Sequence, residues 1–386
     1  MRFDLFAAAG IALLLLIPRS ADAGPRARDL GIPFSGEPGP HNAITDVAGV
    51  LVGHTTLIAG EGPLVVSRGP VRTGVTAILP TGRTNRAVFA AWDTLNGNGE
   101  MTGTAWIAES GQLDEPILLT NTRSVGVVHD VVWDWRRERG YHRGEGPLDF
   151  AALPVVAETW DGRLNDIHGG HVKRGHVFAA LDGAQGGAVA EGNVGGGTGM
   201  VCHRFKGGVG TASRVADGFT LGVLVQANYG SRESLTIAGV PVGRQLGDLM
   251  PEIHSMEEQG SGNSIIVIVA TDAPLLPHQL KRLCRRVPLG IGRVGGFGSN
   301  SSGDLFLAFS TAALRSTDTE AVKLAPVLDN EAIDPLLLAT VEATEEAIVN
   351  ALVAARTMTG INGNTVHALP HDRVVELLRR HGRLAE

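Results

Sequence analysis

The chain has 386 residues, of which 43% are apolar and 19% charged, and its formal net charge is −7. This apolar fraction is typical of a packed globular protein and excludes a disordered one. The charge is modest and spread out. Because no basic stripe is present, we expect no nucleic-acid partner.

The first residues have the features of a secretory signal. Arg2 gives a positive start, and residues 5–17 form an apolar run that is too short to span a bilayer comfortably. Residues 21–23 read Ala-Asp-Ala, a small-residue cleavage pattern directly before Gly24. We therefore predict removal of residues 1–23, a periplasmic or secreted protein and no membrane association afterwards. An uncleaved anchor is the alternative.

Short β-type runs recur along the rest of the chain, and several are apolar throughout. Such runs fit strands that are buried on both faces, between a second sheet and a helical layer. The predicted strands cover residues 50–53, 74–79, 116–119, 153–157, 219–226, 264–270 and 305–309.

Three segments have helical patterns. Residues 277–287 place their apolar side chains on one face, and Pro277 suits a first helical turn. Residues 334–358 form a long helical region, and residues 373–380 a further amphipathic helix. We find no fixed-period repeat.

Two glycine-rich stretches and a histidine cluster are weaker candidates for chemistry. Residues 192–199 and 207–210 lack the Gly-Lys-Ser/Thr of a phosphate-binding loop, so we interpret both as turns where backbone approaches backbone. His168, His171 and His176 lie in a glycine-rich region without a carboxylate or thiolate at ligand spacing. We therefore expect no metal there.

The two cysteines, Cys202 and Cys284, lie in different segments. Export would permit a disulfide between them, but the sequence does not bring them together. We expect two buried free thiols, with a disulfide as the alternative.

Residues 260–274 are the strongest candidate for catalytic chemistry. There a small polar loop runs directly into an apolar β-branched strand. Ser264 stands at the joint. If the bond from Asn263 to Ser264 is cut, Ser264 carries a hydroxyl nucleophile and a free α-amine that can serve as its base. Gly260 and Gly262 permit a strained backbone there. On the residues alone, a serine that merely begins a buried strand and a self-released N-terminal nucleophile stay equally open.

Further motifs follow one another along the chain, at residues 42–50, 52–54, 154–159, 197–200, 205–211, 224–230, 263–267, 270–275 and 301–304. In this order they resemble the family of self-processing serine aminopeptidases that includes the DmpA-type and β-peptidyl aminopeptidases. The resemblance covers nearly all of the mature chain. It implies an α/β fold, a four-layer α-β-β-α sandwich similar in its layers to N-terminal-nucleophile hydrolases but differently connected.

The resemblance also implies a processing site. Cleavage between Asn263 and Ser264 would divide one catalytic domain, residues 24–386, into a large fragment, 24–263, and a small fragment, 264–386. Ser264 matches the family nucleophile. Ser261, in the same loop, would be a bystander.

Four more residues match functional residues of the family, and a fifth position departs from it. Ser302 and Asp304 match the pair that orients the nucleophile's hydroxyl and amine, although some members have Glu at the second position. Asn228 matches the amide that stabilises the oxyanion. Glu158 matches the carboxylate that binds the substrate's free amine. Trp160 stands where DmpA has a tyrosine; since tryptophan cannot relay a proton, we expect it only to shape the substrate-binding pocket.

The implied activity is removal of N-terminal β-amino acids or small L-residues from short peptides and amides, through an acyl-enzyme. No cofactor is expected, and the resemblance implies a homotetramer of processed heterodimers. One alternative is an acyl transferase resembling ornithine acetyltransferases, although those cleave at a threonine. Another is an unprocessed secreted binding protein of the same fold. The preference for β- or α- and for L- or D-residues stays open.

Overall fold

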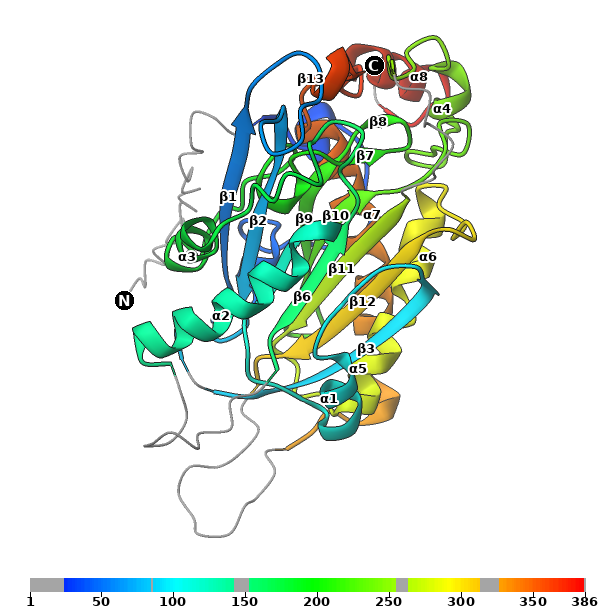
Figure 1. Ribbon diagram of the computed structural model, residues 1–386. Coiled ribbons are helices and arrows are strands. Elements are labelled where there is room, and N and C mark those ends of the chain that lie inside the picture. The colour runs from blue at the N-terminus through cyan, green and yellow to red at the C-terminus, as the bar shows by residue number, and fades with distance from the viewer. Residues whose placement is uncertain (1–23, 85, 142–152, 255–262, 313–325, 385–386) are drawn as a thin grey trace, which may run out of the picture.

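The structure is a computed structural model that describes residues 24–84, 86–141, 153–254, 263–312 and 326–384. Two β-sheets are stacked at its centre, and helices cover the outer face of each (Figure 1). The expected α-β-β-α sandwich is confirmed. The proposed signal segment and Ser261 lie outside the described residues.

The larger sheet has six strands in the order β4-β3-β12-β11-β10-β9. Only β11 and β12 are parallel neighbours, because the chain between them passes through helices α5 and α6 on one face of the sheet. The strands are β3 (Val88–Gly97), β4 (Gln112–Leu113), β9 (Gly208–Ala216), β10 (Phe219–Asn228), β11 (Ser264–Thr271) and β12 (Gly303–Ser310). The covering helices are α5 (Pro277–Cys284), α6 (Val287–Arg293) and α7 (Asp334–Ala354).

The smaller sheet has four strands in the order β1-β2-β5-β6, and helices α2 and α3 pack on its outer face. Its strands are β1 (Leu51–Ala59), β2 (Val71–Leu79), β5 (Ile117–Asn121) and β6 (Val155–Thr159). The helices are α2 (Val125–Arg139) and α3 (Arg174–Asp182).

The remaining elements are short or peripheral. They are α1 (Thr104–Ser110), α4 (Val242–Gln245), α8 (His371–Arg380), the two-stranded pairs β7 (Val201–Cys202) with β8 (Phe205–Lys206) and β13 (Met358–Thr359) with β14 (Thr365–Val366), and 3₁₀ turns at residues 27–30, 44–46, 122–124, 195–197, 330–332 and 361–363. Among the described residues, no helix is both long and apolar enough to cross a membrane.

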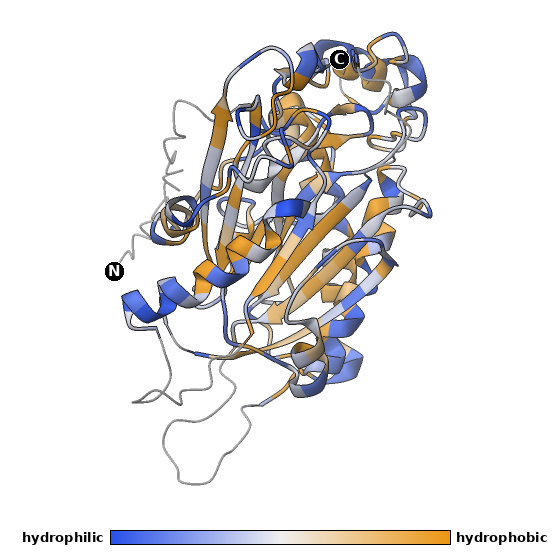
Figure 2. Cartoon of the chain, in the orientation of Figure 1, coloured by the Kyte–Doolittle hydropathy of each residue, from blue (hydrophilic) through white to orange (hydrophobic). Residues whose placement is uncertain are grey.

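The layered fold explains why several strands are apolar along most of their length. On β11, Ile266 and Ile268 point between the two sheets, whereas Ile265 and Val267 point to the covering helices. Because successive side chains of a strand alternate between faces, a strand covered on both sides is mainly apolar, and its few polar side chains need hydrogen-bond partners. Figure 2 shows this as mostly hydrophobic colour along β11, whereas β10 also carries polar residues such as Gln226 and Asn228.

All seven predicted strands and all three predicted helical segments exist, with shifted bounds. The helix expected at 334–358 ends at Ala354, and the one expected at 277–287 is divided into α5 and α6. Residues 192–199 contain a tight 3₁₀ turn at 195–197. Residues 207–210 are not a turn, because β9 begins at Gly208, but backbone does approach backbone closely at Gly207 and Gly210, as expected.

The absence of a side chain at Gly210 brings β9 and α7 together. A Cβ atom there would lie 2.6 Å from the Ala351 nitrogen and would overlap the Ala347 carbonyl. We therefore expect Gly210→Ala to cost about 1–3 kcal/mol of unfolding free energy through overpacking, measured by urea denaturation. Gly126→Ala on α2, which meets nothing within 4 Å, is the matched control and should not lower stability.

Both cysteines are free and buried, as expected. Burial raises the pKa of the Cys202 thiol to about 12. Neither thiol is therefore a ready nucleophile at neutral pH.

Candidate active site

Ser264 is the first residue of β11, in the middle of the larger sheet. Its register partners are Asn228 at the end of β10 and Gly303 at the start of β12. The Ser264 hydroxyl donates to the carbonyl oxygen of Asn263 over 2.7 Å. The hydroxyl thus lies directly beside the peptide bond that the sequence predicts to be cut.

The backbone N–H of Gly303 lies close to both the Ser264 hydroxyl and the Asn263 carbonyl. The Gly303 N–H lies 3.2 Å from the Ser264 hydroxyl oxygen and 3.2 Å from the Asn263 carbonyl oxygen. A fixed N–H aimed at a carbonyl oxygen can stabilise negative charge that develops there. The uncut chain therefore already holds a donor for an oxyanion on Asn263.

Asn228 is fully buried, and its amide is held from both ends. Its Oδ1 accepts from the Val201 N–H over 2.8 Å, and its Nδ2 donates to the Trp160 carbonyl over 3.0 Å. These two contacts fix which end of the amide is the donor. Strand alternation places the side chains of Asn228 and Ser264 on the same face, between the two sheets.

Glu158 lies on β6, at the edge of the smaller sheet, and is only 4% exposed. Its carboxylate accepts from the Glu100 N–H over 3.1 Å and from the Thr122 hydroxyl. Burial raises its pKa, and the Thr122 hydrogen bond opposes that shift. Within the described part of the chain, no cationic side chain forms an ion pair with Glu158, so it is not a structural ion-pair partner there.

Gly99 connects Glu158 to the strand that flanks the nucleophile. A Cβ atom on Gly99 would lie 3.4 Å from Glu158 Oε1 and 3.4 Å from Gly303 Cα. Glu158 and Gly303 therefore both lie next to Gly99. This places a buried carboxylate near Ser264, although the two residues come from different sheets.

Ser302 and Asp304 are in direct contact, with the Ser302 hydroxyl donating to Asp304 Oδ1 over 2.6 Å. Burial raises the pKa of Asp304, while hydrogen bonds from Ser302, Asn96 and the Ile265 backbone oppose the shift. Alternation along β12 places Asp304 on the helix-covered face, away from the Ser264 side chain. The pair thus contacts the backbone of β11 directly after Ser264, through the hydrogen bond from the Ile265 N–H to Asp304.

Trp160 contributes through its backbone. Its carbonyl accepts from Asn228, while its half-buried ring lies 5.6 Å from the Arg163 guanidinium in a cation–π contact. The structure also adds residues that sequence reasoning missed, namely Asn96, Thr122, Val201 and Gly303. Three of these act through contacts that no local pattern encodes. Gly303 could have been found from its place between Ser302 and Asp304.

Two of the three histidines pair with neighbouring residues. His171 pairs with Asp166 over 2.8 Å, and His176 accepts from the Lys173 backbone. Among the residues that the structure describes, no group of three His, Cys, Asp or Glu side chains could hold a metal ion.

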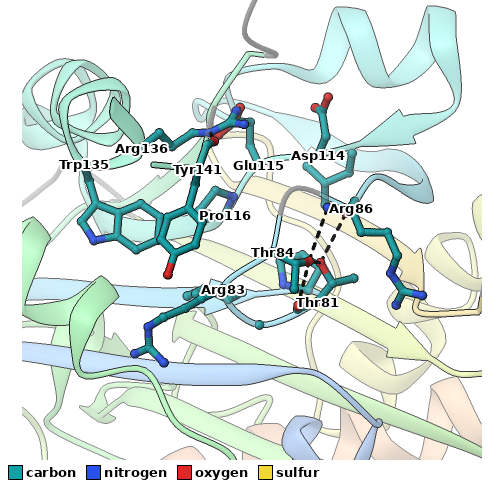
Figure 3. A pocket seen from close by; sticks show the side chains of 14 residues that line it. Thr81, Arg83, Thr84, Arg86, Asp114, Glu115, Pro116, Trp135, Arg136 and Tyr141 are labelled. Carbon is teal, nitrogen blue, oxygen red and sulfur yellow. Dashed lines mark hydrogen bonds and ion pairs between the residues drawn. The ribbon is translucent and has the colours of Figure 1, made fainter. Parts of the chain in front are cut away.

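A cavity between β2 and α2 lies elsewhere (Figure 3). It sits where β5 begins, at Glu115 and Pro116, whereas Glu158 pairs with Thr120 near the far end of β5. Its free space of about 20 Å³ holds roughly one water molecule. This cavity is too small for a peptide substrate.

Comparison with known proteins identifies the family. Residues 42–366 match Peptidase family S58. The chain belongs to this family. The beta-peptidyl aminopeptidase BapA of Sphingosinicella microcystinivorans is 51% identical, over 97% of each chain.

Solved structures of similar proteins cover almost the whole peptidase. The L-aminopeptidase D-Ala-esterase/amidase of Ochrobactrum anthropi, described as a prototype of the serine aminopeptidases, superposes with a TM-score of 0.85 at 48% identity, covering 94% of this chain and all of that one. A β-aminopeptidase of a Burkholderia species gives 0.81 at 47% identity, covering 93% and 99%. The expected family and serine aminopeptidase class are confirmed, and the acyl-transferase and binding-protein alternatives are not favoured.

Proposed function

We propose that this peptidase cuts its own chain between Asn263 and Ser264 and then removes N-terminal β-amino acids or small L-residues from short peptides and amides. The observation that carries the proposal is the Ser264 hydroxyl, 2.7 Å from the Asn263 carbonyl oxygen, with the Gly303 N–H beside both. The 51% identity to a protein named as a β-peptidyl aminopeptidase supports the substrate class.

In the precursor, the Ser264 oxygen attacks the Asn263 carbonyl carbon. The peptide C–N bond breaks, the hydroxyl proton passes to the released nitrogen, and an ester forms. Water then opens the ester, which restores the hydroxyl and leaves Asn263 as a carboxylate. The Gly303 N–H stabilises the oxyanion during this step.

The two fragments would stay together after the cut. Strands β11 and β12 of the small fragment lie between β3 and β10 of the large fragment. The start of the large fragment also contacts α7 of the small one, where Arg28 pairs with Glu346 over 2.8 Å and the Ala27 N–H donates to Asn350 over 3.0 Å. Separation would expose the middle of the larger sheet.

In turnover, the free α-amine of Ser264, with a reference pKa of about 8, takes the proton of its own hydroxyl. The oxygen attacks the substrate carbonyl, the proton passes to the leaving amine, and water hydrolyses the acyl-enzyme. The side-chain amide of Asn228 would stabilise the oxyanion, because an amide N–H can stabilise the negative charge that develops there. Ser302 and Asp304 would orient the new amine through the hydrogen bond between Asp304 and the backbone N–H of Ile265, the residue after Ser264.

Glu158 would pair with the substrate's N-terminal ammonium, which limits the enzyme to terminal residues. The pairing predicts a substrate test. β-Alanyl and L-alanyl p-nitroanilides should be hydrolysed, and N-acetyl-β-alanyl p-nitroanilide should lose at least about a hundredfold in kcat/KM, because it has no ammonium. Equal rates for the free and acetylated compounds would contradict the role of Glu158, and D-alanyl p-nitroanilide tests stereoselectivity.

Two further properties belong to the proposal. The apolar run and the Ala-Asp-Ala pattern support removal of residues 1–23 and export to the periplasm or beyond. The family resemblance supports a tetramer of processed heterodimers. N-terminal sequencing of the secreted large fragment should give Gly24, and native mass spectrometry should give four copies of each fragment.

A further inference from the structure

Lys206 is an unusual residue for its position, because its side chain is fully buried. It lies on β8, in the hairpin with β7, where it stands opposite Val201. Burying a charged ammonium is costly unless its hydrogen-bonding groups are satisfied. The Lys206 side chain must therefore have strong partners.

The partners are three backbone carbonyls. Lys206 Nζ donates to the oxygens of Met200 over 2.7 Å, Gly207 over 2.8 Å and Gly197 over 3.3 Å. An ammonium has three donors, so the carbonyls account for all of them. The ammonium thus links three backbone positions of the glycine-rich segment 197–207.

The contact with Met200 leads directly to the candidate oxyanion donor. The Met200 carbonyl and the Val201 N–H belong to one peptide group. The carbonyl end accepts from Lys206, and the N–H end donates to Asn228 Oδ1 over 2.8 Å. A cation at the carbonyl end polarises the peptide and strengthens the hydrogen bond at its other end.

We propose that Lys206 is a positioning residue, which acts through the Met200–Val201 peptide to hold the Asn228 amide with its NH₂ group toward the substrate carbonyl. The inference rests on the proposed function of Asn228. Without Lys206, the Met200 carbonyl keeps the hydrogen bond from the Gly207 N–H, over 2.9 Å, but loses the shorter one from the ammonium. The Met200–Val201 peptide is then held less firmly, and Asn228 can rotate its amide oxygen toward the developing oxyanion, where it would repel the charge.

A second buried group accompanies Lys206. Asp161 is fully buried and follows Trp160, whose carbonyl accepts from Asn228 Nδ2. Its Oδ1 accepts from Asn165 over 3.0 Å. Burial lowers the pKa of Lys206 to about 7, and the negative charge of Asp161 opposes that shift, while burial raises the pKa of Asp161 itself to about 7. Each end of the Asn228 amide is thus bound by a segment that carries a buried ionisable side chain.

The test compares Lys206→Met, which keeps the length of the side chain and removes the ammonium, with wild type. With β-alanyl p-nitroanilide, we expect kcat to fall about 10- to 100-fold. This decrease does not exceed the one caused by removing a whole oxyanion donor. KM should change less than about threefold. Thr198→Val is the matched control. It removes the buried hydrogen bond from the Thr198 hydroxyl to the Gly195 carbonyl, within the same segment, and should keep wild-type kcat.

A double-mutant cycle separates positioning from mere stability. In an Asn228→Ala background, Lys206→Met should reduce kcat no further, because the group that it positions is gone. Undiminished kcat in the single variant, or a full additional loss in the double variant, overturns the inference. If Lys206→Met does not fold, Lys206→Gln, with a neutral polar end, takes its place under the same criteria. An uncut or inactive wild type would instead contradict the proposed function.

Discussion

Ser264→Ala is expected to yield an intact chain without peptidase activity. The substitution removes the oxygen that would attack Asn263 and that would later attack substrate, while a methyl group fits the 6% exposed site. Removal of a serine nucleophile costs about 10⁶-fold in kcat in an unrelated serine peptidase. A denaturing gel should show one band for the variant and two for wild type, with the smaller wild-type fragment beginning at Ser264.

Ser261→Ala is the matched control, because the same substitution is made three residues earlier in the chain. It should be cut and active like wild type. A fully active wild type that remains one chain would exclude self-processing, even if Ser264→Ala were inactive. Normal cleavage of Ser264→Ala would show that another group attacks the bond.

Glu158→Gln is expected to lower kcat/KM for β-alanyl p-nitroanilide by about a hundredfold. The amide keeps the shape of the side chain but cannot neutralise the substrate ammonium, and loss of a buried charged partner costs about 2–5 kcal/mol. For N-acetyl-β-alanyl p-nitroanilide, the variant and wild type should differ little. This difference between the two substrates distinguishes ammonium binding from a general loss of structure.

Glu100→Gln is the control for this change. The Glu100 side chain is exposed, and its charge affects Glu158 less than burial and the two hydrogen bonds do, while the substitution leaves the backbone N–H that contacts Glu158 in place. We therefore expect kcat/KM to stay within about threefold. An equal loss in both variants, or an equal loss for free and acetylated substrates in Glu158→Gln, would contradict an ammonium-binding role.

The activity of wild type should also depend on the ionisation of Glu158. Burial raises the pKa of this carboxyl above its ordinary value. Below that pKa the group is protonated and neutral, so it cannot pair with an ammonium. As the pH falls, KM for β-alanyl p-nitroanilide should therefore begin to rise at a higher pH than an ordinary glutamate would give, and this acidic limb should be absent in Glu158→Gln.

Some elements were missed in the sequence for identifiable physical reasons. Strand β3 is buried at Val88 but increasingly exposed toward Gly97, and its mixed composition gives no continuous apolar run. Helix α2 begins with β-branched valines, which are weak helix formers. Its packing on the smaller sheet stabilises it in spite of that composition.

The sequence by itself determined the features that depend on local patterns. A polar loop followed by an apolar β-branched run placed Ser264 at the start of a strand, and continuous apolar runs indicated strands covered on both faces. The ordered motifs then identified the family and its layered fold. These features are local because strand periodicity and turn composition are encoded in neighbouring residues.

Only the tertiary structure decided how distant residues meet. Register pairs Asn228 with Ser264, and alternation turns Asp304 to the other face of the sheet. Packing also brings Glu158 beside Gly99 and the buried Lys206 to the peptide that holds Asn228. Such contacts join segments far apart in the chain, and since they depend on which strands pair and how the sheets stack, no local pattern of residues encodes them.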